Sequence, residues 1–251
     1  MLTALDILRT RLDGYKTSNY VIHSDLMIFG RDMLRLKGKA IELLTEGLNP
    51  DSLAIPTFNL NTNSSDVIDL AALDLSMGSL PREAMLALKN KNGKRLPNPI
   101  HSYAIFPENS KIKNINHSKS FGVDSVFDYF TKENYCWISL GADVDSGFTI
   151  FHHLECLSAV PYRKHLSFER TLIEENKKSV VQFEYFARND DNYKQNFKKA
   201  LQFLVKEEVV TVDYLGGKAI YTGLVNDIEA ALIPKLNENP FYLVKKNDDR
   251  K

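Results

Sequence analysis

Apolar positions recur along this chain with two periods, one typical of strands and one typical of helices. Alternating or wholly apolar runs favour strands, and apolar residues at every third or fourth position favour helices. Strands are predicted at residues 20–26, 53–58, 102–106, 135–140, 168–174, 180–187, 209–214 and 218–222. Helices are predicted at residues 3–14, 33–44, 80–90, 123–130 and 192–206. The pattern predicts an α/β fold in which strands and helices alternate, followed by an α+β unit with antiparallel strand pairs in the C-terminal third.

Three polar segments connect these elements. Asn176-Lys177-Lys178 and Leu215-Gly216-Gly217 are predicted hairpin turns, and the Gly-Gly pair strongly favours a tight one. Residues 59–76 are rich in Asn and Ser and are too many for a turn. Because loops of this length inside a domain are usually functional, we expect this one to cover the site.

Composition narrows the class of protein. The 251 residues are 43% hydrophobic, which is enough for a sizeable core, and we expect one domain over residues 1–251. The 32 basic and 32 acidic side chains give no net field, so nucleic acid is not an expected partner. Two cysteines, Cys136 and Cys156, do not make a disulfide framework and fit a reducing cytoplasm. No apolar run approaches the roughly 18 residues that span a bilayer, so no membrane contact is expected.

Two motifs carry the candidate chemistry. His101 lies in Asn98-Pro99-Ile100-His101-Ser102-Tyr103-Ala104, and Glu155 lies in Thr149-Ile150-Phe151-His152-His153-Leu154-Glu155. An imidazole accepts a proton near neutral pH, and a carboxylate on its other nitrogen fixes the tautomer and raises basicity. The two motifs therefore predict a base and its orienting acid, suited to activating an amine, an alcohol or water.

The second motif allows other interpretations. If residues 149–157 are helical, His152 and Glu155 share a face while His153 points elsewhere. Thr149 would then be a helix cap and Glu155 a solvated surface acid. A metal site with His101, His152 and Glu155 has no supporting ligand spacing. A thiol nucleophile at Cys156 is less favoured than core packing, because a reactive thiol needs exposed, electropositive surroundings.

Taken in order, the motifs resemble the aminoglycoside 3-N-acetyltransferase family, also called the antibiotic N-acetyltransferase family. The resemblance covers residues 3–165. Its pieces are His23-Ser24-Asp25-Leu26 with Gly30, Pro56-Thr57-Phe58, Met77-Gly78-Ser79-Leu80-Pro81, Asn98-Pro99-Ile100-His101-Ser102, Phe121-Gly122 with Ser125, and Thr149-x-x-His152-x-x-Glu155 followed by Tyr162-Arg163. The resemblance implies a mixed sheet flanked by helices, completed by residues 166–251, and N-acyl transfer from an acyl-coenzyme A without a glycine-rich phosphate loop. No such loop is present in the sequence.

The resemblance also implies roles for single residues. His101 is expected to be the general base toward the substrate amine, with Glu155 as its support. The residues expected to bind the coenzyme are His23, Ser24, Asp25, Leu26, Thr57, Ser102 and Ser125. Those expected to contact the acceptor are Phe58, Asp74, Arg95, Asn98 and His152. Backbone N–H groups near Ser24, Asp25 and Leu26 are the expected oxyanion donors, the acyl group is acetyl or 3-hydroxyacyl, and no metal is expected.

Departures from the family pattern bear on the acceptor. Asn98 stands where the family has a histidine, and Arg95-Leu96 keeps only half of an Arg-Ser pair. A neutral chain with cations near the motifs favours an anionic, nucleotide-linked amino deoxysugar of surface-polysaccharide biosynthesis. Those cations are Arg82, Lys94, Arg95, Arg163 and Lys164. The alternative is an aminoglycoside, as in antibiotic resistance, with ammonium contacts at Asp66, Asp69, Asp74, Asp143 and Asp145. A non-catalytic binding protein, a hydrolase and a homodimer stay open.

Overall fold

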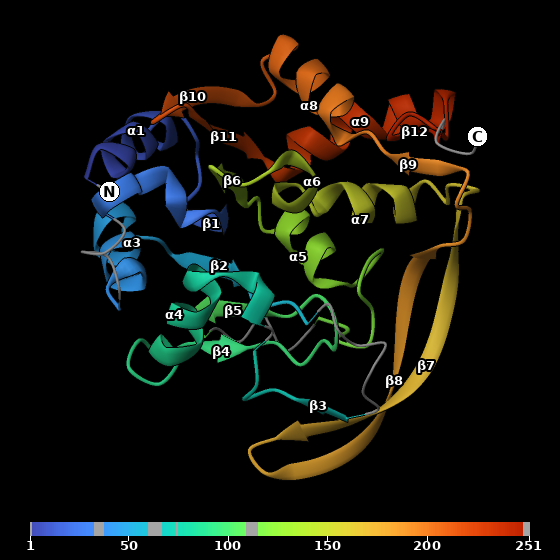
Figure 1. Ribbon diagram of the computed structural model, residues 1–251, viewed down its shortest axis with the longest axis horizontal. Coiled ribbons are helices and arrows are strands. Elements are labelled where there is room, and N and C mark those ends of the chain that lie inside the picture. The colour runs from blue at the N-terminus through green and yellow to red at the C-terminus, as the bar shows by residue number, and fades with distance from the viewer. Residues whose placement is uncertain (1, 33–37, 60–66, 74, 109–114, 248–251) are drawn as a thin grey trace.

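A sheet of seven strands runs through the centre of the described structure (Figure 1). The computed structural model describes residues 2–32, 38–59, 67–73, 75–108 and 115–247. The strand order is β10-β11-β6-β1-β2-β5-β4. The bounds in that order are Thr211–Leu215, Lys218–Leu224, Cys136–Leu140, Asn19–Ser24, Ser52–Pro56, Tyr103–Phe106 and Lys94–Arg95. Strands β6, β1 and β2 are parallel and are flanked by antiparallel β11 and β5, so the sheet is mixed, as predicted.

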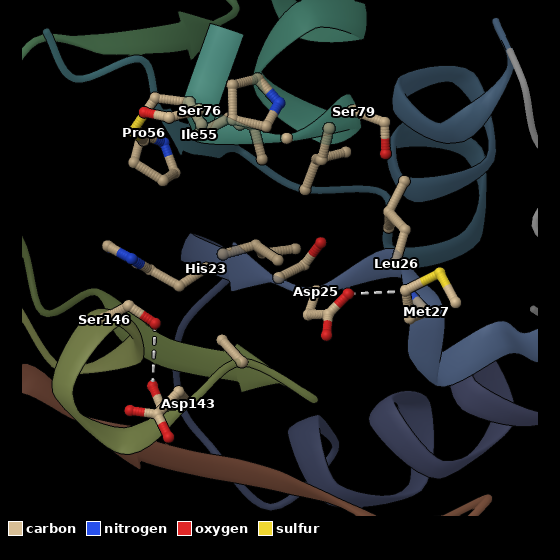
Figure 2. Close-up of a pocket in the computed structure, with 17 residues that line it drawn as sticks. His23, Asp25, Leu26, Met27, Ile55, Pro56, Ser76, Ser79, Asp143 and Ser146 are labelled. Atoms are coloured by element: carbon tan, nitrogen blue, oxygen red, sulfur yellow. Dashed lines mark hydrogen bonds between the residues drawn. The ribbon is translucent and has the colours of Figure 1, made fainter. Parts of the chain in front are cut away.

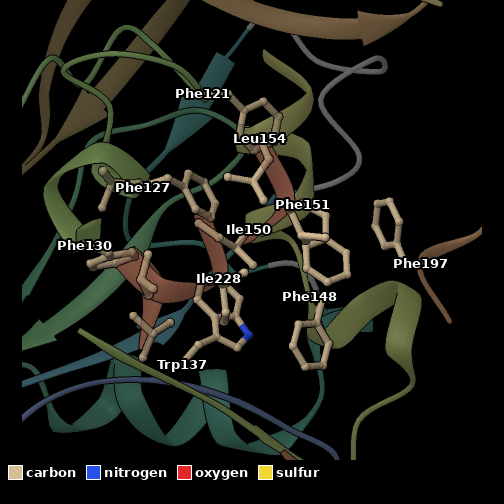
Figure 3. Packing of buried hydrophobic residues seen from close by; sticks show 14 of the residues in the cluster. Phe121, Phe127, Phe130, Trp137, Phe148, Ile150, Phe151, Leu154, Phe197 and Ile228 are labelled. Atoms are coloured by element: carbon tan, nitrogen blue, oxygen red, sulfur yellow. The ribbon is translucent and has the colours of Figure 1, made fainter. Parts of the chain in front are cut away.

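Alternate side chains of β1 enter two hydrophobic cores, one on each face of the sheet. Tyr20 and Ile22 belong to the core covered by α1, α3 and α4, whereas Val21 belongs to the core covered by α5, α7, α8 and α9. The helix bounds are Leu2–Leu12 (α1), Ala40–Leu48 (α3), Ser79–Ala87 (α4), Val126–Lys132 (α5), Ile150–Leu157 (α7), Phe197–Lys206 (α8) and Val225–Glu238 (α9). In the second core Trp137 packs among aromatic side chains of the helices (Figure 3). Burial on both faces explains why the central strands are almost continuously apolar.

A long hairpin follows α7 and belongs to a second sheet, separate from the main one. Its strands β7 (Arg163–Glu174) and β8 (Lys177–Arg188) pair along their whole length, and β3 (Val67–Asp69) pairs with β7. Figure 1 shows the hairpin curving along one side of the molecule toward β3. Elsewhere β9 (Tyr193–Gln195) pairs with β12 (Val244–Lys246). The remaining short helices are α6 (Val144–Gly147), η1 (Leu26–Asp32) and η3 (Leu75–Met77).

The predicted fold class is confirmed, and most predicted elements are present with their ends shifted. The Gly216 and Gly217 turn is confirmed, since both glycines have positive φ, 57° and 79°, as a tight hairpin turn requires. The helix expected at residues 149–157 is α7. No helix in the described ranges has the length and apolar character needed to cross a membrane.

Several predicted boundaries are wrong. The helix expected from residue 192 begins only at Phe197, because residues 193–195 pair with a strand fifty residues away in sequence, which local periodicity does not reveal. The first hairpin turns at Glu175 and Asn176, one residue earlier than expected. Residues 67–69 of the polar stretch form β3, and residues 60–66 and 74 lie outside the described structure. Leu26 starts η1 and does not extend β1. The helix expected at residues 33–44 is α3, and residues 33–37 lie outside the described ranges.

Candidate active site

Glu155 is the centre of a buried ionic cluster formed by α7 and the start of β7. Its Oε2 lies 2.7 Å from His152 Nδ1 and 2.7 Å from Arg163 Nε, and its Oε1 accepts a hydrogen bond from the Tyr162 hydroxyl at 2.8 Å. Burial raises the pKa of Glu155, but His152, Arg163 and Tyr162 together outweigh burial and hold that pKa below its ordinary value. The carboxylate is therefore ionised at neutral pH. The alternative of a solvated surface acid is wrong, because the side chain has no exposed area.

His152 is the imidazole that Glu155 orients. The two side chains are three residues apart on one face of α7, as the helical spacing predicted, and His152 keeps 16% of its side chain exposed. Arg163 Nη2 also approaches Nδ1, at 2.8 Å, but the carboxylate at 2.7 Å favours a proton on Nδ1 and leaves the lone pair on Nε2. Burial lowers the pKa of His152, with Glu155 opposing and Arg163 assisting. The ring is thus neutral at pH 7, and Nε2 carries the electron pair that can accept a proton.

The expected pair of His101 with Glu155 is not formed. Within the described residues Glu155 bonds to His152, Tyr162 and Arg163, and the buried Nδ1 of His101 has no hydrogen-bond partner. The reason is local: Asn98 Oδ1 accepts from the backbone N–H of His101 at 2.7 Å and fixes the loop that carries it. Burial lowers the pKa of His101 well below its ordinary value, and the neighbouring His152 adds to this effect. His101 is therefore a buried, neutral imidazole without an acid beside it.

A row of aromatic rings connects the end of β1 with α7. The Phe58 ring lies 5.9 Å from the ring of His23 and 4.9 Å from that of His101, measured between centroids. The Phe121 ring lies 4.5 Å from His101 and 5.8 Å from His152. The structure thus brings together His23, Phe58, His101 and His152, which the sequence assigned to one site from four separate motifs.

A cavity of about 540 Å³ opens at the β1 end of this row. Figure 2 shows His23 and Asp25 on one wall, Ser76 and Ser79 on the opposite wall, and Asp143 and Ser146 beside them. Ser24, Asp25 and Leu26, predicted to bind the coenzyme, all line it.

The polar groups of that wall differ in how they are satisfied. The Asp25 carboxylate accepts from Met27 N at 2.9 Å and pairs with Lys218. The buried Ser24 hydroxyl has no partner in the described structure. The ring of His23 stacks on Trp137 at 4.6 Å, and burial lowers its pKa to about 3. The wall therefore offers neutral groups and one compensated carboxylate.

Three of the predicted contact residues form an internal network behind the site. Arg95 donates to Ser102 Oγ at 3.0 Å and to the carbonyls of Leu70 and Thr57 at 2.7 and 2.8 Å. Thr57 Oγ1 donates to Ser102 Oγ at 3.2 Å, and all three side chains are buried. Because every strong donor here already has a protein acceptor, the network holds the loop after β2 in place and presents no open surface.

Asn98 and Ser125 are also internal. Asn98 Nδ2 donates to the carbonyls of His117 and Lys119 at 3.0 and 3.1 Å. Ser125 is the N-cap of α5 and accepts from Asp128 N. Both side chains are buried, so they connect the loops around His101 and α5.

The expected acids separate into two groups. Asp143 is the N-cap of α6 and lines the cavity, and Asp145 lies in the first turn of α6 and interacts electrostatically with His152. Burial, followed by Asp143, raises the pKa of Asp145. Asp69 lies in β3 and accepts from Ala71 N at 2.8 Å. Asp66 and Asp74 lie outside the described residues.

Metal and thiol sites find no support in the geometry. The described ranges contain no group of three or more His, Cys, Asp or Glu side chains placed to hold a metal ion. Burial raises the pKa of Cys156 to about 11, so its thiol is protonated at neutral pH. His153 is fully buried, and its Nδ1 accepts from Gly122 N at 3.1 Å.

One contact of the cluster had no signal in the sequence. Gln195 Nε2 lies 3.2 Å from His152 Nε2, across 43 residues of chain. The glutamine falls where a helix was predicted, and only the pairing of β9 with β12 brings it to α7.

Comparison with solved structures shows the fold. The chain superposes on aminoglycoside acetyltransferase AAC(3)-IIb with a TM-score of 0.72 and 15% identity, covering 94% of this chain and 97% of that one. AAC-IIIb in a binary complex with CoASH gives 0.70 and 16%, covering 94% and 96%. Sisomicin-bound AAC-VIa gives 0.70 and 16%, covering 94% and 97%.

Sequence comparison shows the family. No curated protein sequence gives a significant match. The family model described as aminoglycoside 3-N-acetyltransferase matches residues 73–228, which is more than half of the chain and includes the loop of His101, all of α7 and the strand of Gln195. The chain therefore belongs to the aminoglycoside 3-N-acetyltransferase family, and the resemblance seen in its motifs is confirmed.

Proposed function

We propose that this protein transfers an acetyl group from acetyl-coenzyme A to an amino group of an aminoglycoside-type sugar, with His152 as general base and Glu155 as its orienting acid. N-acyl transfer is the activity of the family to which the chain belongs. Coenzyme A as co-substrate is supported by the CoASH complex of the AAC-IIIb neighbour. The observation that carries the proposal is the His152 and Glu155 pair, with a neutral imidazole that keeps 16% of its side chain exposed.

The reaction needs one proton transfer at each end. As the amine nitrogen attacks the thioester carbonyl, a C–N bond forms and the amine proton passes to His152 Nε2. When the C–S bond breaks, the imidazolium returns that proton to the departing thiolate of the coenzyme. Glu155 stabilises the imidazolium between these steps, because its carboxylate lies 2.7 Å from Nδ1 and is already ionised.

We propose that the cavity beside His23 binds the thioester arm of acetyl-coenzyme A. The first residues of η1 and of α4 line it, and helix N-termini present N–H groups without intrahelical acceptors. Within the expected oxyanion motif Ser24-Asp25-Leu26, however, Asp25 N already donates to Leu140 O at 3.0 Å, and just after the motif Met27 N donates to the Asp25 side chain. We therefore place the oxyanion donors nearer the start of α4, at Ser79 and Leu80, than at Asp25.

The acceptor is better described as an aminoglycoside than as the nucleotide-linked sugar favoured by overall charge. Three of the cations expected to meet a nucleotide have partners: Arg95 binds carbonyls, Arg163 pairs with Glu155, and Lys94 pairs with Glu108. Of the acids expected to meet ammonium groups, Asp145 interacts electrostatically with His152, and Asp143 lines the cavity. The sisomicin complex of the AAC-VIa neighbour supports the same class of acceptor. We keep residues 1–251 as one proposed domain, since β11 from the last third completes the main sheet.

Thiol release from acetyl-coenzyme A tests the acceptor. We expect turnover with aminoglycosides such as sisomicin and gentamicin and none with nucleotide-linked 3-amino or 4-amino deoxysugars. Turnover restricted to the nucleotide sugars would refute the proposed acceptor and restore the interpretation from charge. 3-Hydroxybutyryl-coenzyme A in a parallel assay identifies the acyl group.

The choice of base is tested with three histidine variants. His152→Ala is expected to lower kcat by about 10²- to 10⁴-fold, the usual contribution of a positioned base. His101→Ala removes a buried ring that has no acid beside it, so we expect it to lower kcat less than His152→Ala does. His165→Ala is the matched control, because this histidine is exposed on β7. A larger loss of kcat for His101→Ala than for His152→Ala would return the role of base to His101.

A further inference from the structure

Strands β9 and β12, from the last third of the chain, form a pair that lies beside His152. Tyr193 on β9 stacks on Phe241 with a centroid separation of 4.7 Å, and Asn196 N donates to Leu243 O at 2.9 Å. Gln195 pairs with Val244 across the β9 and β12 ladder. These contacts fix the backbone of residues 193–196 independently of α7.

This strand pair places the side-chain amide of Gln195 next to the proposed base, His152. Gln195 Nε2 lies 3.2 Å from His152 Nε2, and the Phe197 ring, two residues on, lies 5.1 Å from the imidazole. An amide NH₂ group can only donate, so in this arrangement His152 Nε2 is the acceptor. The Glu155 carboxylate, 2.7 Å from Nδ1, demands a proton on the opposite nitrogen. Gln195 and Glu155 therefore favour the same tautomer from opposite sides of the ring, in opposition to Arg163 Nη2, which can only donate and lies 2.8 Å from Nδ1.

We propose that Gln195 is a positioning residue of this site: its amide holds the His152 lone pair on Nε2 in the free enzyme and is displaced from that nitrogen by the incoming amine. The role rests on the proposed assignment of His152 as base. It gives residues 193–195 and 244–246 a function in the site, beyond completing the fold. It also implies that the free enzyme keeps its base neutral and covered until an amine displaces the amide.

Several titratable or charged groups also influence the pKa of His152. They are Glu155 on α7, Arg163 on β7, Arg188 on β8, Asp145 on α6 and His101 in the loop before β5. Gln195 differs from these because it is uncharged and bonds directly to Nε2. Its replacement by leucine therefore changes the preferred protonation of one nitrogen without changing the net charge.

The test follows the imidazole of His152 by ¹⁵N NMR, with no need for turnover. The chain has six histidines, and a His152→Gln variant assigns the signal. Gln195→Leu removes the donor to the neutral ring and is expected to raise the pKa of His152 by roughly half to one pH unit, the size of one hydrogen bond. Gln195→Glu replaces the donor with an anionic acceptor and is expected to raise the pKa further and to move the proton toward Nε2. The acid limb of kcat/KM should shift in the same order.

Gln182→Leu is the matched control. This glutamine also lies on a strand, but it is exposed on β8 and bonds to Glu169 at 2.9 Å. It is expected to leave the His152 signal unchanged. If Gln195→Leu does not fold, Gln195→Asn tests the same contact by withdrawing the amide by one methylene. An unchanged pKa and tautomer of His152 in folded Gln195 variants would overturn the proposal, even if acetyl transfer itself is confirmed. Absence of turnover with the expected NMR shifts would instead count against the proposed function alone.

Discussion

The two sides of the site are built from different kinds of interaction. The cavity side comes from the ends of β1 and β2 and the start of α4, and its wall offers backbone groups, hydroxyls and the compensated Asp25. The His152 side is a network of charged and polar side chains from α7, β7 and β9 centred on Glu155. A wall made of backbone tolerates exchange of a side chain, whereas a buried charge network does not. Substitutions should therefore affect mainly coenzyme binding on one side, and stability together with turnover on the other.

Removal of the central carboxylate should have the largest effect. Glu155→Ala leaves the buried Arg163 without its anion and His152 without its orienting acid. We expect a loss of about 3–5 kcal/mol in the free energy of unfolding, the usual cost of breaking a buried ion pair, measured by urea denaturation. Glu184→Ala, an exposed acid on β8, is the control. A loss below about 1 kcal/mol for Glu155→Ala would mean that the cluster is solvated and the contrast between the two sides is false.

Acidification should weaken the same side through its neighbour His153. Burial lowers the pKa of His153 to about 4 in the folded state, against about 6.5 in the unfolded state. As pH falls below 6.5 the unfolded chain takes up the proton first, so stability decreases until the folded pKa is reached. The slope is about 1.4 kcal/mol per pH unit for one histidine.

Urea titrations at pH 7, 6 and 5 measure that slope. In His153→Gln the dependence of the unfolding free energy on pH should be shallower, because one histidine no longer contributes to it. An equal slope in the variant and the wild type would show that His153 titrates normally and is not held neutral by burial.

On the cavity side, changing the backbone conformation should affect coenzyme binding more than changing most side chains. Gly78 is the residue before α4 and has φ 86° and ψ −167°, a region that other residues rarely adopt. An added Cβ would meet no atom within 4 Å, so Gly78→Ala should cost only backbone strain, about 1–3 kcal/mol. Gly38→Ala carries a similar strain, at φ 77° and also in open space, away from the cavity lining. Only Gly78→Ala should also raise the KM for acetyl-coenzyme A, and equal KM values in the two variants would exclude the start of α4 from the coenzyme site.

The same division separates what the sequence predicted from what it did not. The shared face of His152 and Glu155 was found because both lie in α7, where a spacing of three or four residues decides which side chains meet. The motif His23-Ser24-Asp25-Leu26 was found as one continuous segment, which spans the end of β1 and the start of η1. The pairing of His101 with Glu155 was wrong because it required a contact between elements, and Glu155 already had His152 within its own helix.

Long-range partners could not be read from periodicity. Gln195 reaches His152 through a strand pair between residues 193–195 and 244–246, and the local pattern there favoured a helix. Arg95 was expected to meet substrate from the family resemblance and as a cation near the motifs, but its guanidinium donates to loop carbonyls in the interior. Family resemblance indicated which segments to expect near the site, and the contacts between their side chains came from the structure.

The smallest effect on stability should come from Ser24, and it is the most direct test of the cavity. Its buried hydroxyl has no hydrogen-bond partner in the described structure, so Ser24→Ala breaks no bond and should change the free energy of unfolding by less than about 0.5 kcal/mol. If that hydroxyl bonds to the coenzyme, the KM for acetyl-coenzyme A should rise about fivefold, the equivalent of one hydrogen bond. Ser139→Ala is a matched control, because Ser139 on β6 is likewise buried and unpartnered among the described residues but does not line the cavity. A raised KM for Ser24→Ala alone places the coenzyme beside β1, whereas equal KM values for both variants would separate this cavity from acyl transfer and leave the Glu155 cluster as the only part of the site tied to the reaction.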